Sequence, residues 1–343
     1  TMTHPCRIRA LATLLAAVFA LAPCAQGADK AVKIRLGTLA PRGSSYFKHL
    51  QAMGEAWKSA GAALTIYADG TMGSEADMVR RMRLGQLQAG MLTVVGLQDI
   101  EPAAAGLQNI PMMFRTLEEV DAVGEKLQPM IEKRLAEKGF VVLCWTDTGW
   151  VRIFSKDPVI TPDDLKKTKL FVWAGSTADV DIYRSVGCTP VPLETADILP
   201  GLRTGLIDAV PLPPTIALAG QVDSVASHMI ELNWAPLVGA VVMTKKSWDA
   251  LPPEAQENVR TAAAEAGRSI KADGRRESVE SVAAMKKRGL EVHPVSDEVL
   301  AQWLQEVEPT YSLVRGTMVP ADIFDEVAAQ VKAYRAAGAS DKE

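Results

Sequence analysis

The 343-residue sequence has few histidines, few cysteines and none of the short motifs that mark common enzyme classes. It contains no HExxH, no G-x-S-x-G, no Walker loop, no G-x-G-x-x-G after a strand and no C-x-x-C. Beyond the N-terminal region the histidines are His49, His228 and His293, and none stands at metal-ligand spacing from another ligand. We therefore expect no catalytic residues, no metal and no cofactor, although a triad assembled from distant positions would leave no such motif.

The charge balance also excludes some partners. The chain has 37 basic and 41 acidic residues, a formal net charge of −4, which indicates ordinary solubility. No basic run is interleaved with aromatic residues, so nucleic acid is not an expected partner. Low-complexity tracts and fixed-period repeats are missing as well. A chain of this length can hold two domains, each with a sizeable core.

The N-terminus has the pattern of a secretory signal peptide. Arg7 and Arg9 precede an apolar stretch over 10–22, and a small-x-small site follows at 25–27. The stretch is too short to span a bilayer comfortably. We predict that residues 1–27 are a signal peptide cleaved near Gly27 and that the protein is exported to the periplasm. Lipid anchoring at Cys24 is an alternative, but the preceding proline fits a lipobox poorly.

Strand and helix patterns alternate along the first half of the chain. Strands are predicted at 31–41, 63–69 and 89–95, and a helix at 46–61 with Ser44 or Ser45 as its cap. A helix over 116–139 and a buried strand over 140–147 follow. This alternation predicts an α/β domain with a largely parallel sheet.

A second region begins near Gly149, with strands at 150–155 and 169–175, a helix over 177–187 and a short helix closed by Gly205. A long helical pattern over 253–288 is covered by charged residues, which suits a helix lying across two domains. We predict lobe I over 28–150, completed by about 239–275, and lobe II over 151–238, completed by about 276–335. A cleft between the lobes is expected at the carboxyl ends of the strands.

Two cysteines remain beyond the signal peptide, Cys144 and Cys188. The periplasm permits a disulfide between them. Cys144 lies within the apolar run FVVLCW, however, and we interpret both residues as separate apolar packing groups.

The chain resembles the DctP-type solute-binding proteins of tripartite ATP-independent periplasmic (TRAP) transporters over nearly all of the mature sequence. Six segments in the right order carry the resemblance, at 34–57, 67–87, 109–114, 163–176, 187–210 and 248–256. The resemblance implies a two-lobed periplasmic binding protein fold of the α/β class, with an interlobe cleft, a strand-built hinge and a long helix bridging both lobes. It also implies no catalysis, closure on a small-molecule ligand by hinge motion, and delivery to TRAP membrane permease subunits. Most relatives act as monomers, and we expect the same here.

The sequence departs from this family where a ligand carboxylate is usually held. The family strand reads like K-I-R-V-P and its arginine clamps the carboxylate, whereas residues 169–173 read KLFVW and place Phe171 at the arginine position. The polar positions of a second family motif fall on Pro211 and Leu212. A phenyl ring cannot replace the two-pronged bond of a guanidinium, and a buried unpaired carboxylate is costly. The departure therefore predicts an apolar or weakly polar ligand.

The candidate ligand-binding residues follow from this interpretation. Phe171, Trp173 and Leu212 are expected to line an apolar pocket, together with Met112, Met113 and Trp234. Arg152 is either a relocated anion clamp or a salt-bridge partner near the hinge. Glu75 matches an acidic family position near the cleft mouth but also suits a helix start, and Arg42 could reach a ligand or stay solvated. Two alternatives stay open: an organic-acid binder that uses Arg152, and a carrier of lipid-like or sterol-like molecules with a non-TRAP partner.

Overall fold

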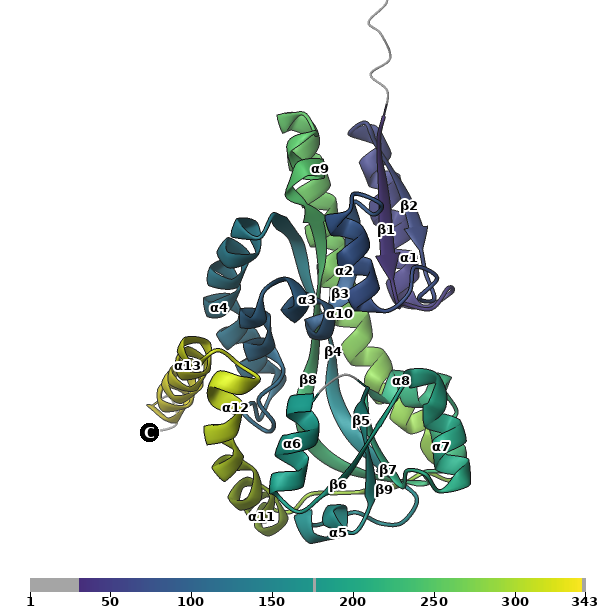
Figure 1. Cartoon of the computed structure of the whole chain (residues 1–343), viewed down its shortest axis with the longest axis vertical. Coiled ribbons are helices and arrows are strands. Elements are labelled where there is room, and N and C mark those ends of the chain that lie inside the picture. The colour runs from purple at the N-terminus through teal and green to yellow at the C-terminus, as the bar shows by residue number, and fades with distance from the viewer. Residues whose placement is uncertain (1–30, 175–176, 341–343) are drawn as a thin grey trace, which may run out of the picture. The chain divides into compact units, whose positions relative to one another are not determined.

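The computed structural model describes residues 31–174 and 177–340 (Figure 1), so the predicted signal peptide lies outside the described part of the chain. Within that part, nine strands form one mixed sheet in the order β2-β1-β3-β8-β4-β7-β5-β6, with β9 beside β8. The strands are β1 (Val32–Thr38), β2 (Ala62–Tyr67), β3 (Ala89–Thr93), β4 (Phe140–Ser155), β5 (Lys169–Trp173), β6 (Thr189–Leu193), β7 (Ala209–Leu212), β8 (His228–Thr244) and β9 (Glu291–His293).

Parallel pairing holds each end of the sheet together, and antiparallel pairing joins the two ends. β1 pairs in parallel with β2 and β3, and β5 pairs in parallel with β6 and β7. The long strands β4 and β8 are antiparallel to each other. β4 is also antiparallel to β7, and β8 is also antiparallel to β3. We call the part built on β1–β3 lobe I and the part built on β5–β7 lobe II. The two lobes are therefore linked by β4 and β8, as a strand-built hinge requires.

The prediction of two strands over 140–147 and 150–155 was wrong, because β4 is a single strand of 16 residues. Its pairing with β8 shifts register between Asp147 and Trp150, and Gly149 has a φ of +83°. A bulge at this point lets the strand bend without ending the ladder, and glycine adopts the left-handed backbone at little cost. The predicted break is thus a bend at the hinge.

The helices of lobe I are α1 (Ser45–Ser59), α2 (Glu75–Arg83), α3 (Val94–Ile100) and α4 (Leu117–Glu137). Ser44 caps α1 by accepting a hydrogen bond from the Phe47 N–H, as predicted. α3 was not predicted, because its first residues are apolar and β-branched and extend the strand pattern. The strand stops at Thr93, whose side chain accepts from the Val95 N–H and starts the helix.

The helices of lobe II are α5 (Pro162–Lys166), α6 (Thr177–Ser185), α7 (Ile198–Thr204) and α8 (Pro214–Ala219). Gly205 ends α7 as predicted. Phe154, Phe171, Leu202 and Leu212 form a buried core on one face of the lobe II sheet. A second core on the other face contains Leu170 and Ile230. The sheet of lobe II is thus covered on both sides.

The predicted bridging helix is α10 (Pro253–Lys287), which follows the short α9 (Lys245–Asp249). Figure 1 shows α10 passing from α1 in lobe I to α8 in lobe II, and it contacts both helices. Val259 and Ala263 are buried in the lobe I core, whereas Met285 is buried in the lobe II core. Gly267 permits a close approach to β4, because a Cβ atom there would lie 2.8 Å from the Cβ of Cys144.

The remaining helices are α11 (Asp297–Val307), α12 (Tyr311–Thr317) and α13 (Ala321–Ser340). α13 buries Ile323, Val327 and Val331 in the same core as Leu127 and Ile131 of α4. The C-terminal helix therefore packs with lobe I, although most of it falls in the range 276–335 that was predicted to complete lobe II. The exact lobe boundaries stay a prediction.

Two further features concern the helices and the cysteines. None of the helices in the described ranges combines the length and apolarity that crossing a membrane requires. Cys144 and Cys188 are both free and buried, and burial raises the pKa of the Cys144 thiol to about 12. The two cysteines are thus apolar packing groups in this structure.

Candidate functional site

A row of three side chains crosses lobe II at the carboxyl ends of β5 and β7. Arg152 of β4 pairs with Leu212 of β7. Leu170 of β5 pairs with Ala209 of β7, and continuing this register places Trp173 beside Leu212. Residues opposite each other in neighbouring strands share a face of the sheet. Arg152, Leu212 and Trp173 therefore lie in one row on one face, at the edge where α/β folds commonly bind ligands.

Arg152 is a mostly buried cation with a neutral partner. Its guanidinium Nη1 donates a 2.6 Å hydrogen bond to Asn233 Oδ1. Among the described residues no carboxylate lies within ion-pair distance of this guanidinium. Burial lowers the pKa of Arg152 to about 10, against an opposing effect of Glu231. A buried charge is stable only when it is paired, so this guanidinium is suited to receiving an anion.

The aromatic residues of β5 differ in exposure. Phe171 is 1% exposed and packs inside the lobe II core. Trp173 is 40% exposed and meets Phe171 edge-on, with ring centroids 4.9 Å apart. Phe171 therefore supports the indole from below, whereas the indole itself offers an apolar surface. Leu212, 1% exposed, belongs to the same core as Phe171.

The hinge is held by side chains from β4 and α10. Arg275 of α10 donates to Asp147 at 2.8 Å and also to Asp121 of α4. Burial alone would raise the pKa of Asp121, but hydrogen bonds from Arg275 and Lys271 outweigh it and lower this pKa. Asp147 is 5% exposed, so its charge depends on this pairing.

Two polar side chains at the hinge were not singled out from the sequence. The Thr148 hydroxyl is buried and has no hydrogen-bond partner among the described residues. Tyr46 of α1 lies nearby, since a Cβ atom on Gly274 would meet both Thr148 Cα and the Tyr46 hydroxyl within 3.2 Å. Burial, with Glu277 beside it, raises the pKa of Tyr46 to about 12. A threonine in a strand and a tyrosine in a helix are too common for the sequence to mark them.

The other predicted site residues lie elsewhere in the fold. Met112 and Met113 line a cavity of about 320 Å³ together with Tyr311 and Arg335. Trp234 lines a separate cavity of about 50 Å³ near Tyr183, and the Trp234 carbonyl accepts from the Met112 N–H. The residues that line these two cavities do not include Phe171, Trp173, Leu212 or Arg152. The structure thus separates the methionines and Trp234 from the row on β4, β7 and β5.

Glu75 and Arg42 have partners within the protein. The Glu75 carboxylate accepts from the Thr93 N–H, the Thr93 hydroxyl and the Gly96 N–H, which ties α2 to the start of α3. Burial raises the pKa of this carboxyl. Arg42 is exposed and lies 3.3 Å from Asp69. A ligand-binding role for these two residues stays a prediction.

The fold and this edge define the class. Two α/β lobes joined by two long strands and braced by one long helix are the architecture of binding proteins that hold a ligand between lobes. Residues 36–315 match the family model described as bacterial extracellular solute-binding protein, family 7 (DctP), so the chain belongs to this family. The family is one of solute-binding proteins, which bind small molecules and work with membrane permease subunits, and not one of enzymes.

Individual relatives agree with the family assignment. The C4-dicarboxylate-binding periplasmic protein DctP of Rhodobacter capsulatus is 22% identical over 278 residues, covering 79% of this chain and 81% of the relative. The TRAP periplasmic solute-binding protein of Chromohalobacter salexigens, solved with D-glucuronate, has a TM-score of 0.79 at 21% identity, over 88% and 99% of the two chains. That of Ralstonia eutropha, solved with (S)-2-acetolactate, has a TM-score of 0.79 at 17% identity, over 88% and 99%. These likenesses establish the two-lobed fold.

Proposed function

We propose that the protein is exported with cleavage near Gly27, captures a small-molecule ligand between its lobes and delivers it to TRAP membrane permease subunits. Family membership and the N-terminal signal pattern support this proposal. The bend of β4 at Gly149 provides the place where the lobes can rotate, since β4 and β8 carry the sheet from one lobe to the other. We expect the protein to act as a monomer.

The proposed ligand is a small organic acid whose body is apolar or only weakly polar. The observation that carries this proposal is the mostly buried Arg152 guanidinium, which has a neutral hydrogen-bond partner and lacks an ion pair with any described carboxylate. A ligand carboxylate would supply the missing charge and a two-pronged, charge-assisted hydrogen bond. The relatives solved with D-glucuronate and (S)-2-acetolactate hold organic acids, which supports the same ligand class.

The apolar part of the proposed ligand is assigned to the other end of the row. The exposed indole of Trp173 stands about two strand spacings from Arg152, or roughly 10 Å between backbones. An acid of that length could place its carboxylate on Arg152 and its apolar body on Trp173. Buried apolar ligand area returns about 25 cal/mol per Å², so the indole adds affinity without a second charge. In this proposal Phe171 and Leu212 support the indole from the core.

A ligand with no acid group is the second candidate, and the loss of the family arginine at Phe171 favours it. It covers both an apolar solute taken up through a TRAP permease and a lipid-like or sterol-like molecule carried to a non-TRAP partner. This candidate leaves the Arg152 guanidinium with the neutral Asn233 side chain as its hydrogen-bond partner and adds no anion, so it ranks second.

Identification of the bound molecule tests these candidates. The mature protein would be purified from its native periplasm, extracted with organic solvent, and the extract analysed by mass spectrometry against an extract of an Arg152→Ala variant. A stoichiometric organic acid that is lost in the variant supports the proposal. A neutral apolar molecule that remains bound in the variant refutes it and favours the second candidate.

A further inference from the structure

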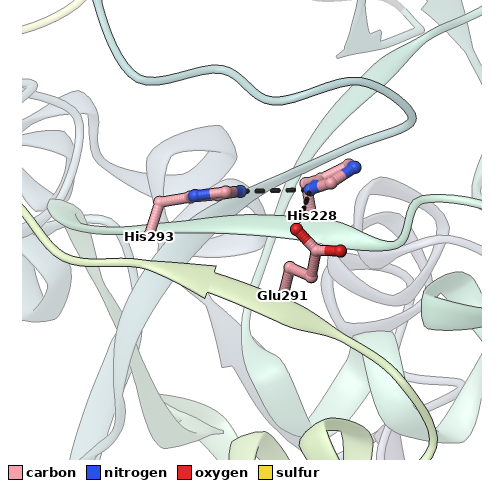
Figure 2. Close-up of side chains that lie close together, drawn as sticks. All are labelled: His228, Glu291 and His293. Carbon is pink, nitrogen blue, oxygen red and sulfur yellow. Dashed lines mark hydrogen bonds and ion pairs between the residues drawn. The ribbon is translucent and has the colours of Figure 1, made fainter.

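Two histidines and a glutamate from distant parts of the sequence meet at the start of β8 (Figure 2). His228 Nδ1 lies 3.1 Å from His293 Nε2 and 3.5 Å from Glu291 Oε2. The two imidazole rings are stacked, with centroids 5.2 Å apart and planes 25° apart. The three side chains each point one donor atom into the same space, and all three atoms lie within 4.8 Å of one another.

Strand pairing explains why these side chains converge. β8 and β9 are parallel, with His228 opposite Glu291 and Ile230 opposite His293. Glu291 and His293 are two residues apart on β9, so their side chains project from the same face, and His228 shares that face through its pairing. The cluster is therefore fixed by the backbone of two strands and does not depend on a loop. Side chains that project from strands are positioned more precisely than side chains on loops.

We propose that His228, Glu291 and His293 bind a divalent transition-metal ion, with Zn²⁺ as the best match. Imidazole nitrogen and carboxylate oxygen bind Zn²⁺ at about 2.0–2.2 Å, so two ligand atoms in a tetrahedral site stand roughly 3.3 Å apart. The observed separations of 3.1 and 3.5 Å bracket this spacing. Two neutral imidazoles with one carboxylate are a ligand set that suits Zn²⁺, whereas Ca²⁺ and Mg²⁺ prefer all-oxygen sites.

The exposure of the three ligands leaves room for the ion to enter. The Glu291 side chain is 69% exposed, whereas the His228 side chain is 16% exposed. Two of the four tetrahedral positions would thus be supplied from a partly buried imidazole pair and one from a carboxylate at the surface. Water would occupy the fourth position. A metal here would join the first residue of β8 to a strand of three residues that follows α10. We expect it to stabilise lobe II, because an ion that binds only the folded state adds its binding free energy to folding.

The test uses the untagged mature protein, stripped of metal with a chelator and titrated with Zn²⁺ by calorimetry. The expected result is one Zn²⁺ per chain and a rise in the melting temperature, with no response to Mg²⁺ or Ca²⁺. Affinity should fall at least about tenfold in His228→Ala, in His293→Ala and in Glu291→Gln, because each removes a ligand. His49→Ala is the matched control: His49 is a partly buried histidine that pairs with Asp273, and its loss should leave Zn²⁺ binding unchanged.

Three outcomes would overturn the proposal. The wild-type protein binds no Zn²⁺ at micromolar concentrations, or the His228→Ala and His293→Ala variants bind as tightly as wild type, or His49→Ala loses binding equally. In each case the two imidazoles share a direct hydrogen bond and nothing more. If a histidine variant fails to fold, X-ray absorption at the zinc edge of the wild-type protein is measured in place of that variant's affinity. Two imidazole nitrogens in the first coordination shell support the site, and a shell without imidazole refutes it.

Discussion

Replacing Arg152 with alanine is expected to abolish most of the ligand affinity while leaving the fold intact. Burial lowers the pKa of Arg152 to about 10, which means that the folded protein disfavours the charged guanidinium by about 3 kcal/mol. A ligand carboxylate that pairs with the guanidinium recovers free energy of this order. Since each 1.4 kcal/mol is a tenfold change in affinity, Arg152→Ala should weaken binding of an acidic ligand by roughly a hundredfold.

Arg152→Ala is not expected to destabilise the ligand-free protein. The charged guanidinium opposes folding near neutral pH, so its removal should leave the melting temperature of the ligand-free protein unchanged or slightly raised. Arg152→Ala is therefore expected to lower the ligand affinity without lowering the melting temperature, which is the pattern for a residue whose role is to bind a ligand. An arginine that serves only the fold would lower the melting temperature when replaced.

Calorimetry with matched probes provides the assay. Phenylacetate and phenylacetamide have the same apolar body, and only the first has a carboxylate. The wild-type protein should prefer phenylacetate, and Arg152→Ala should remove the preference. Arg80→Ala is the control, because Arg80 is exposed, pairs with Asp77 and is not a candidate ligand-binding residue. Equal affinity of wild type and Arg152→Ala for phenylacetate, or for the acid extracted from the native protein, would refute the reasoning.

Further substitutions test the remaining parts of the site and the hinge. Phe171→Ala should destabilise the protein by about 3–5 kcal/mol in denaturant unfolding, because it empties a core position, whereas Trp173→Ala should cost about 1 kcal/mol in stability and weaken ligand binding instead. Equal stability losses would place both residues in the core. Gly149→Ala should cost about 1–2 kcal/mol and slow ligand-induced closure in stopped-flow fluorescence, since its φ is +83°; an unchanged closure rate would remove the bend from the mechanism. Arg275→Ala should cost about 3 kcal/mol, because the buried Asp147 loses its hydrogen-bonded cation and keeps only Lys271 at 3.7 Å. The lowered pKa of Asp121 stabilises the fold above the pKa of the unfolded chain, and this stability is lost as pH falls through the folded value. Wild type should therefore lose stability in acid more steeply than Arg275→Ala, and parallel pH profiles would contradict the pairing.

Local patterns were sufficient for most elements of the fold. The alternation of Val32, Ile34 and Leu36 predicted β1, Ser44 marked the start of α1, and the long helical pattern marked α10 to within one residue at its C-terminal end. The errors occurred where tertiary contacts decide the outcome. Two strands were predicted on either side of Gly149, whereas pairing with β8 on both sides keeps β4 continuous. α3 was missed because Val94 and Val95 favour a strand and only the Thr93 cap redirects the chain.

In the candidate site, too, single residues were predicted from the sequence, but their grouping depended on tertiary contacts. The family motifs singled out Phe171 and Leu212, the strand pattern singled out Trp173, and Arg152 was chosen as a cation on a nearby strand. The sequence grouped these residues with two methionines and Trp234, which line other cavities. Proximity in space depends on strand order and register, and a single sequence specifies neither directly. Likewise, His228 and His293 are isolated in the sequence and meet only because β9 pairs with β8.

The sequence by itself determined the class of protein, because each of the six family segments is a run of residues close together in the chain. Only the tertiary structure decided which side chains share a face. It buried Phe171, left the Trp173 indole open, gave Arg152 a neutral partner and assembled the histidine cluster. The physical reason is that exposure and charge pairing are properties of packed neighbours. Around Arg152 these neighbours come from strands that are far apart in the chain, since Asn233 is 81 residues away.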